Sequence, residues 1–194
     1  MRTFITGIIS ITIILIIAIP LVLARVFWQK RFLRATALLL DEKYNEAIEE
    51  YNKLKSFSVG LKWLRNQHCA VAWLGLNNRE EFVKELAKTK SKFINAPKYF
   101  LLTMDKLMNK ELESAKINYD IFINAPTRYL DMWFMDKHKK IIYASLAYES
   151  GSPDAKAKIA EALSYIYTPG YNRFTVPVIK KYLENALNEL TGND

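Results

Sequence analysis

The chain has few of the residues from which catalytic and ligand-binding sites are usually built. Its 194 residues include one cysteine, two histidines and six glycines. The single Cys69 cannot form an intramolecular disulfide, which fits a reducing compartment. His68 and His138 are far apart, and no Cys-x-x-Cys or His-x-x-x-His spacing suggests a zinc or di-iron site. Glycine-rich phosphate-binding motifs are also missing. We therefore predict no metal, no cofactor and no enzymatic activity.

His68 and Cys69 form the one adjacent pair that could act as a base and a nucleophile. Neighbouring residues of a helix point about 100° apart, so the imidazole is poorly placed to deprotonate the thiol. Cys69 also falls beside Ala70 and Trp73 on an apolar helix face. We interpret it as a buried structural cysteine.

Signals for β-strands are missing as well. The chain shows no sustained alternation of apolar and polar residues and no Asn-Gly or Asp-Gly hairpin turn. Helix breakers recur instead at short intervals, most clearly at Gly151-Ser152-Pro153. The pattern predicts an all-α chain. The expected helices cover 29–40, 43–56, 61–76, 79–93, 97–108, 111–123, 126–149, 153–166 and 175–190.

A long apolar run is present near the N-terminus. Residues 3–24 carry no charge and are bounded by Arg2 and Arg25. A helix of this length extends about 33 Å, enough to cross a hydrocarbon core of ~30 Å. We therefore predict a transmembrane anchor within residues 1–28. A cleaved signal peptide is an alternative, although the run is longer than the usual apolar region of one. A core helix would need more interior than a small domain offers.

The flanks of the run predict an orientation. Aromatic and basic side chains come after it, as expected at a membrane interface, and bases outnumber those before it. The positive-inside rule then places the C-terminal domain in the cytoplasm, with a single-pass location in the cell membrane and the lipid bilayer as a partner. The helix is expected to continue unbroken into the first helix of the domain. The predicted interface residues are Arg25, Phe27, Trp28, Lys30, Arg31 and Arg34.

The formal net charge of +8 comes largely from intermixed charges of both signs. The densest basic run, residues 137–140, lies within a predicted helix. A solvated helix face explains it better than a nucleic-acid footprint, which would need a basic stripe with stacking aromatics. We predict no nucleic-acid partner.

Internal similarity indicates repeated helix pairs. Residues 44–51 resemble residues 112–119, and Ala47 and Ala115 are 68 residues apart, which is twice 34. The segment Phe-Ile-Asn-Ala-Pro occurs at both 93–97 and 122–126, at a spacing of 29. The repeat is therefore present but irregular.

These features resemble the tetratricopeptide repeat (TPR) family, in which small residues sit where two helices cross. Ala35 with Ala47 and Thr103 with Ala115 would be such pairs, and Ala70 fits the same position. Phe82 stands where the family has alanine, and a fourth unit matches loosely at Ser145, Tyr148 and Ala157. The resemblance implies a solenoid of about four hairpins over 29–166, followed by a loop and a capping helix over 167–194. A helical bundle with chance spacing is the alternative.

The resemblance also implies a function. TPR-like proteins with an anchor typically act as adaptors or scaffolds that assemble protein complexes at the cytoplasmic membrane face. An alternative is an accessory subunit of a membrane complex, whose anchor packs against partner helices through Gly7, Ser10 and Thr12. Exposed Met and aromatic clusters suit partner binding, and burial within the solenoid is the alternative for the segment 129–135. The candidate partner-binding residues are Tyr129, Met132, Trp133, Met135, Tyr171 and Arg173.

Overall fold

The computed structural model describes residues 2–55, 59–88, 95–125, 132–167 and 177–192, with the side chains at 2–15, 17, 59, 95 and 132–134 outside the description. The described residues are almost entirely helical and contain no strand, which confirms the prediction of an all-helical chain. The helices are α1 (Arg2–Leu40), α2 (Tyr44–Asn52), α3 (Val59–Gly75), α4 (Arg79–Ala87), α5 (Asn95–Met108), α6 (Leu112–Ile123), α7 (Met132–Glu149), α8 (Ala155–Ile166) and α9 (Pro177–Gly192).

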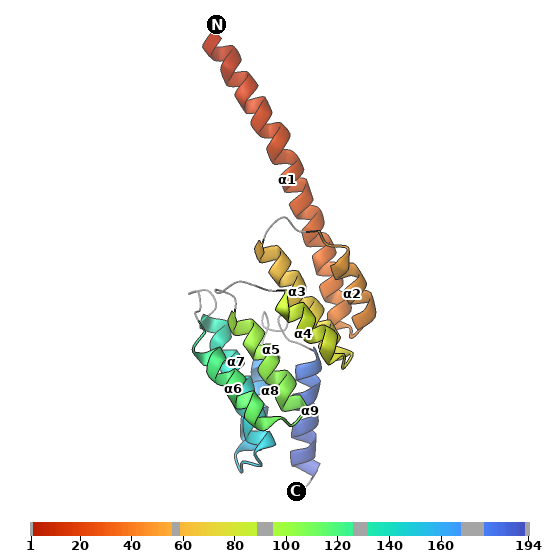
Figure 1. Ribbon diagram of the computed structural model, residues 1–194, viewed down its shortest axis with the longest axis vertical. Coiled ribbons are helices and arrows are strands. Elements are labelled where there is room, and N and C mark those ends of the chain that lie inside the picture. The colour runs from red at the N-terminus through yellow and green to blue at the C-terminus, as the bar shows by residue number, and fades with distance from the viewer. Residues whose placement is uncertain (1, 56–58, 89–94, 126–131, 168–176, 193–194) are drawn as a thin grey trace.

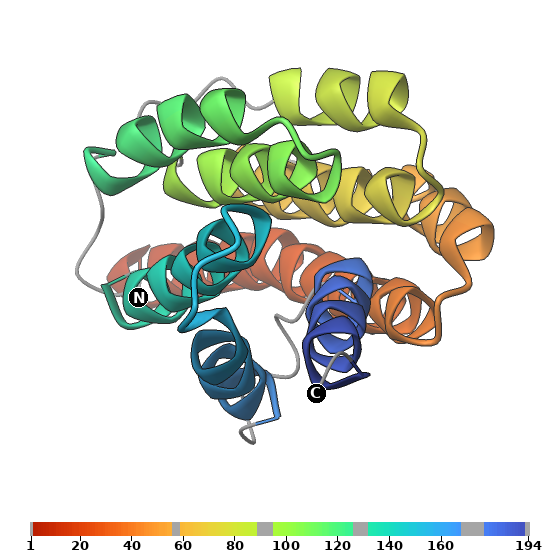
Figure 2. The ribbon, with the colours of Figure 1, turned by 90° about the horizontal axis from the view of Figure 1, so that it is seen from below.

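The helices pack as successive pairs (Figure 1). α1 packs against α2, α3 against α4, α5 against α6, and α7 against α8. Contacts of α2 with α3 and of α5 with α7 stack these pairs on one another. α9 packs on α8 and also touches α3, so the C-terminal helix returns toward the early pairs (Figure 2).

The four pairs share one turn geometry. One residue after the first helix of each pair has a positive φ, and its N–H donates to the carbonyl three residues earlier. The next N–H donates to the carbonyl five residues before it, which completes a Schellman motif. These residues recur at spacings of 35, 33 and 41. They are Glu42 (59°), Asn77 (55°), Lys110 (59°) and Gly151 (67°).

Fully buried residues, most of them small, occupy equivalent positions in the pairs. Each lies seven residues before the left-handed residue in the first helix, and five residues after it in the second helix of the first three pairs. The bulky exception is Phe82, which is buried where the other second helices have alanine. The first-helix positions are Ala35, Ala70, Thr103 and Ala144, and the second-helix positions are Ala47, Phe82 and Ala115.

The fourth pair has a different register. α8 begins four residues after Gly151, whereas the second helix of each earlier pair begins two residues after its left-handed residue. Ala157 is consequently exposed, and Ala155 and Ile159 are buried in its place. Ser145 is buried as expected, and its hydroxyl donates to the Ile141 carbonyl at 2.9 Å. The longer turn therefore explains why the predicted position of Ala157 is wrong.

α1 is one continuous helix of 39 residues whose N-terminal part extends away from the stacked pairs (Figure 1). The predicted continuity from the apolar run into the first helix of the domain is confirmed. Over the residues that the structure describes, however, no helix keeps an apolar stretch long enough to cross a bilayer. The described side chains of α1 begin at Ile16, and four basic residues interrupt the apolar sequence between Ile16 and Leu40. A crossing needs ~20 predominantly apolar residues.

This finding contradicts two expectations that depended on the same helix. They are the predicted transmembrane anchor and the predicted single-pass location in the cell membrane with a cytoplasmic domain.

Candidate functional site

Phe27 and Trp28, expected together at a membrane interface, have different surroundings. Phe27 is exposed, and the Arg31 guanidinium lies 4.7 Å from its ring centroid. Trp28 is buried and stacks on Phe32, with 4.9 Å between the ring centroids. Trp28 is therefore a core residue, contrary to the expected position, because the four-residue spacing places its ring against Phe32. Of the basic residues expected at the interface, Arg25, Lys30 and Arg34 are exposed.

Trp28 belongs to an aromatic cluster that joins the first three helices. The Phe32 ring centroid lies 5.6 Å from that of Tyr51 on α2 and 4.9 Å from that of His68 on α3. The Tyr51 hydroxyl lies 3.0 Å from the Thr36 hydroxyl. The indole Nε1 of Trp28 is buried without a hydrogen-bond partner among the described residues. The cluster therefore fixes α1 to α2 and α3 chiefly by ring packing.

His68 and Cys69 lack the electrostatics of a catalytic pair. His68 Nδ1 donates to the Leu64 carbonyl at 2.9 Å, and burial lowers the pKa of the imidazole to about 4. Burial raises the pKa of the Cys69 thiol to about 12, with Glu85 adding to the effect. A thiol nucleophile needs a lowered pKa and a base that can accept its proton. The geometry therefore supports the structural interpretation of Cys69.

The predicted partner-binding residues are not brought together in the described part of the chain. Tyr129, Tyr171 and Arg173 lie outside the described residues, and Met132 and Trp133 lie in the first turn of α7 with undescribed side chains. Met135 is buried in the core. The burial of Met135 agrees with the alternative that its segment packs inside the solenoid, and not with a role in partner binding.

A groove lies where the C-terminal helices approach the turn of the first pair. Its volume is about 1140 Å³, and residues from the α1–α2 turn, α8 and α9 line it. Leu40, Leu163 and Ile166 contribute apolar surface, and Lys180 and Lys181 contribute cationic side chains. Sequence reasoning missed this groove because its two sides are more than a hundred residues apart along the chain. The adjacent lysines of α9 were the only local signal.

The groove contains charges of both signs. Lys180 Nζ lies 3.7 Å from Glu184 and 4.9 Å from the centroid of the Tyr167 ring. The Tyr167 hydroxyl donates to Glu184, which raises the pKa of the tyrosine. Lys181 is exposed beside them. Mixed charge over apolar surface is typical of a protein-binding groove rather than of a buried small-molecule pocket.

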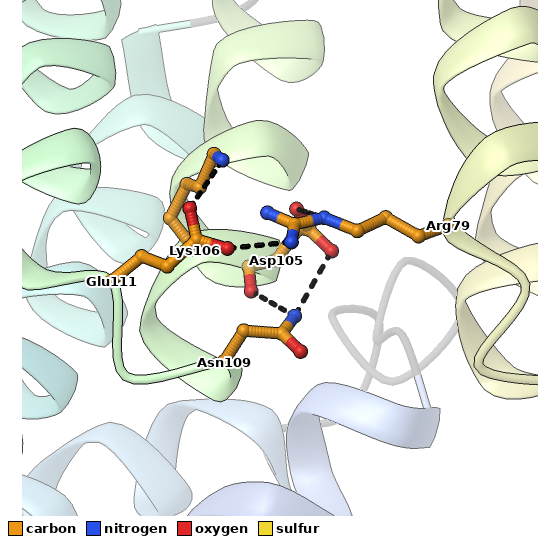
Figure 3. A network of polar contacts seen from close by, with 5 residues as sticks. All are labelled: Arg79, Asp105, Lys106, Asn109 and Glu111. Carbon is orange, nitrogen blue, oxygen red and sulfur yellow. Dashed lines mark hydrogen bonds and ion pairs between the residues drawn. The ribbon is translucent and has the colours of Figure 1, made fainter.

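A polar network joins the second and third pairs at their turns (Figure 3). Arg79, the first residue of α4, donates from Nε to Asp105 Oδ2 at 3.0 Å, and its Nη1 lies 2.5 Å from Glu111 Oε1. Glu111 Oε2 also lies 2.5 Å from the Nζ of Lys106. Asn109 donates from Nδ2 to the Asp105 carbonyl oxygen at 2.7 Å. These groups lie in sequence segments too far apart for a local pattern to reveal the network.

The carboxylates of the network are paired with cations inside the fold, whereas Arg79 Nη2 is buried without a hydrogen-bond partner among the described residues. Burial raises the pKa of Asp105, and the Arg79 guanidinium opposes that shift. Hydrogen bonds from Arg79 and Lys106 lower the pKa of Glu111 to about 2. We interpret the network as a structural tie between two pairs, because Arg79 of the second pair binds the Asp105 and Glu111 carboxylates of the third.

Across the described residues, no cluster of three or more His, Cys, Asp or Glu side chains is placed to hold a metal ion. The groove and the exposed apolar side chains of α1 are the features that could contact a partner. Comparison with protein-family models, curated proteins and solved structures gives no match.

Proposed function

We propose that the protein is a TPR-like helical-repeat adaptor that holds a protein partner in the groove between the α1–α2 turn and helices α8 and α9. The observation that carries the proposal is the groove itself, about 1140 Å³ in volume and lined by apolar side chains and by charges of both signs. Stacked helix pairs commonly present extended binding surfaces of this kind.

The repeated turn supports the TPR-like part of this proposal. Four pairs end their first helix with the same hydrogen-bonding pattern, and three consecutive turns recur at spacings of 35 and 33 residues. The TPR period is about 34 residues. The internal similarity at Ala47 and Ala115 therefore corresponds to equivalent buried positions in two pairs.

Charge reversal within the groove tests the proposal. Lys181 is exposed and lines the groove, so Lys181→Glu changes the local charge without disturbing the core. The full-length chain and this variant should be immobilised separately and used to capture proteins from a lysate of the source organism. Quantitative mass spectrometry then compares the two captures. We expect a small set of proteins to be lost from the variant.

Lys116→Glu is the matched control, because Lys116 is exposed on α6, outside the groove. It makes the same charge change and should retain the captured proteins. Identical capture by all three chains, or the absence of any specifically captured protein, would overturn the proposed function.

A further inference from the structure

α1 has two opposite faces with different environments. Trp28, Ala35 and Leu39 are buried against the pairs. On the other side, Val26, Leu33 and Leu40 are 43%, 65% and 41% exposed. At 100° per residue the two sets lie about half a turn apart. We call the second set, with Lys30 and Ala37 between its members, the exposed face of α1.

The exposed face has the spacing of a helix-packing seam. Its five residues succeed one another at intervals of four, three, four and three, the pattern of the apolar positions of a coiled coil. Ile16, Ile19 and Leu23 fall on the same spacing in the projecting part of α1, where Leu21 and Val22 are exposed as well. At its other end, Leu40 lines the groove between α1, α8 and α9. The seam is therefore continuous with the groove.

Such a surface is unusual for the first helix of a stack. Terminal repeats of helical-repeat proteins generally present a polar face, because no further repeat covers them. Here the face presents Val26, Leu33 and Leu40. An apolar seam of this kind is typical of a surface that another helix covers.

The charges of α1 indicate which kind of helix could cover its exposed face. Residues 2–40 contain five basic side chains and no acidic one. Lys30, in the middle of the seam, is exposed and makes no ion pair with any described residue. The hydrogen bond from Lys53 lowers the pKa of Glu50 on α2, and Arg34, at the edge of the seam, adds to this shift together with Arg31. A second copy of α1 would bring like charges together, whereas carboxylates would complement Lys30.

We propose that the exposed face of α1 binds an amphipathic helix of a partner protein, with apolar residues on the seam and a Glu or Asp side chain opposite Lys30. This inference rests on the proposed adaptor function and specifies the class of its partner. The partner helix would continue the stack before α1, with one end near the groove.

Two synthetic peptides can test this inference. Each should be about 15 residues long, enough to form several helical turns, with a leucine seam. Glutamates flank the seam in one, and lysines replace them in the other. Fluorescence anisotropy with the full-length chain should show saturable binding of the glutamate peptide, with the lysine peptide at least about tenfold weaker. Lys30→Glu should reverse this preference.

Leu33→Glu should weaken binding of the glutamate peptide by about tenfold or more, because it places a charge in the seam. Ile117→Glu on α6 is the matched control, since Ile117 is 63% exposed and Leu33 is 65% exposed. Equal binding of the two peptides, equal effects of the two glutamate variants, or a lack of peptide binding would overturn the inference.

A second copy of the chain or a lipid surface on the exposed face of α1 would give different results in these experiments. Self-association lost in Leu33→Glu would identify a second copy, and binding to phospholipid vesicles in place of the peptide would identify a lipid surface; either result overturns the inference. Lys181→Glu should leave peptide affinity unchanged. If peptide binding fails while groove-dependent capture from lysate persists, the inference fails and the proposed function stands.

Discussion

The ring of Tyr44, at the start of α2, lies directly against Gly75, at the end of α3. A Cβ built on Gly75 would lie 2.5 Å from Cε1 and 2.7 Å from Cε2 of that ring, closer than any normal contact. The first and second pairs therefore approach one another at a point where only glycine fits.

Gly75→Ala is expected to lower the free energy of unfolding by about 1–3 kcal/mol, because the methyl group must displace the Tyr44 ring. In a helix without this contact the same change would raise stability by ~1 kcal/mol. Urea denaturation followed by circular dichroism measures the effect. Gly192→Ala, with open space around it, serves as the control. In a Tyr44→Ala background the loss should disappear, and its persistence would contradict the proposed cause.

Ala115→Leu is expected to destabilise the fold by about 1–3 kcal/mol, since Ala115 is fully buried where α5 and α6 cross. Ala157→Leu should leave thermal unfolding nearly unchanged because Ala157 is exposed on α8. Scanning calorimetry of the two variants compares the same substitution in the third and fourth pairs. Similar transition temperatures for both would mean that the two pairs share one register.

Arg79→Leu is expected to destabilise the protein by about 3 kcal/mol, because it leaves the buried Asp105 carboxylate without its guanidinium. Adding Asp105→Asn should recover part of the loss by removing the uncompensated charge. Lys84→Leu removes an exposed lysine that pairs only within α4, and its denaturation curve should overlay the parent curve. If Arg79→Leu unfolds at the same urea concentration as the parent chain, the network contributes nothing to the joint between the pairs.

Two partly buried histidines predict a loss of stability in mild acid. Burial lowers the pKa of His68 to about 4 and that of His138 to about 3, from an ordinary value near 6.5. Below pH 6.5 the unfolded chain takes up protons that the folded chain does not. Stability should therefore be full above about pH 6.5 and fall toward pH 4, by up to ~1.4 kcal/mol per pH unit for each histidine.

Urea midpoints measured between about pH 7 and pH 4.5 test this dependence. Replacing both histidines by phenylalanine should flatten the profile, since the rings pack against aromatic neighbours but no longer titrate. Glu111 titrates in a lower window, because its pKa lies at about 2 in the folded chain. A profile with the same slope in the double variant would rule out the histidines as its source.

Local patterns were sufficient for the helices and for most of the crossing positions. Helices end near Asp41, Asn77 and Lys110, where one residue of each turn has a left-handed backbone conformation. Turns of this kind favour particular residue types, so the sequence indicates where the helices end. The small residues Ala35, Ala70 and Thr103 were expected at crossing positions from the resemblance to tetratricopeptide repeats, and they are buried there. The fourth pair was predicted in the wrong register because two further residues separate Gly151 from α8, which the repeat spacing alone does not reveal.

Features built from distant segments could not be predicted in the same way. Trp28 comes just after the apolar run, which suggested an interfacial role, but its burial depends on Phe32 and the neighbouring α3. Arg79 meets Asp105 only because two turns stack on one another. The groove likewise requires α9 to return beside the first pair. Each depends on how helix pairs are placed, which a linear pattern does not encode.

The continuity of α1 has a mechanical consequence. The helix that projects from the domain also forms the first pair, so no flexible linker separates the two parts. Tension applied to the projecting part would pass along the helix to the contacts of Trp28 and Phe32 with α3. The contacts of the first pair with α3 would therefore bear that tension directly. Force on the projecting part of α1 would therefore act on the aromatic cluster that joins α1 to α2 and α3.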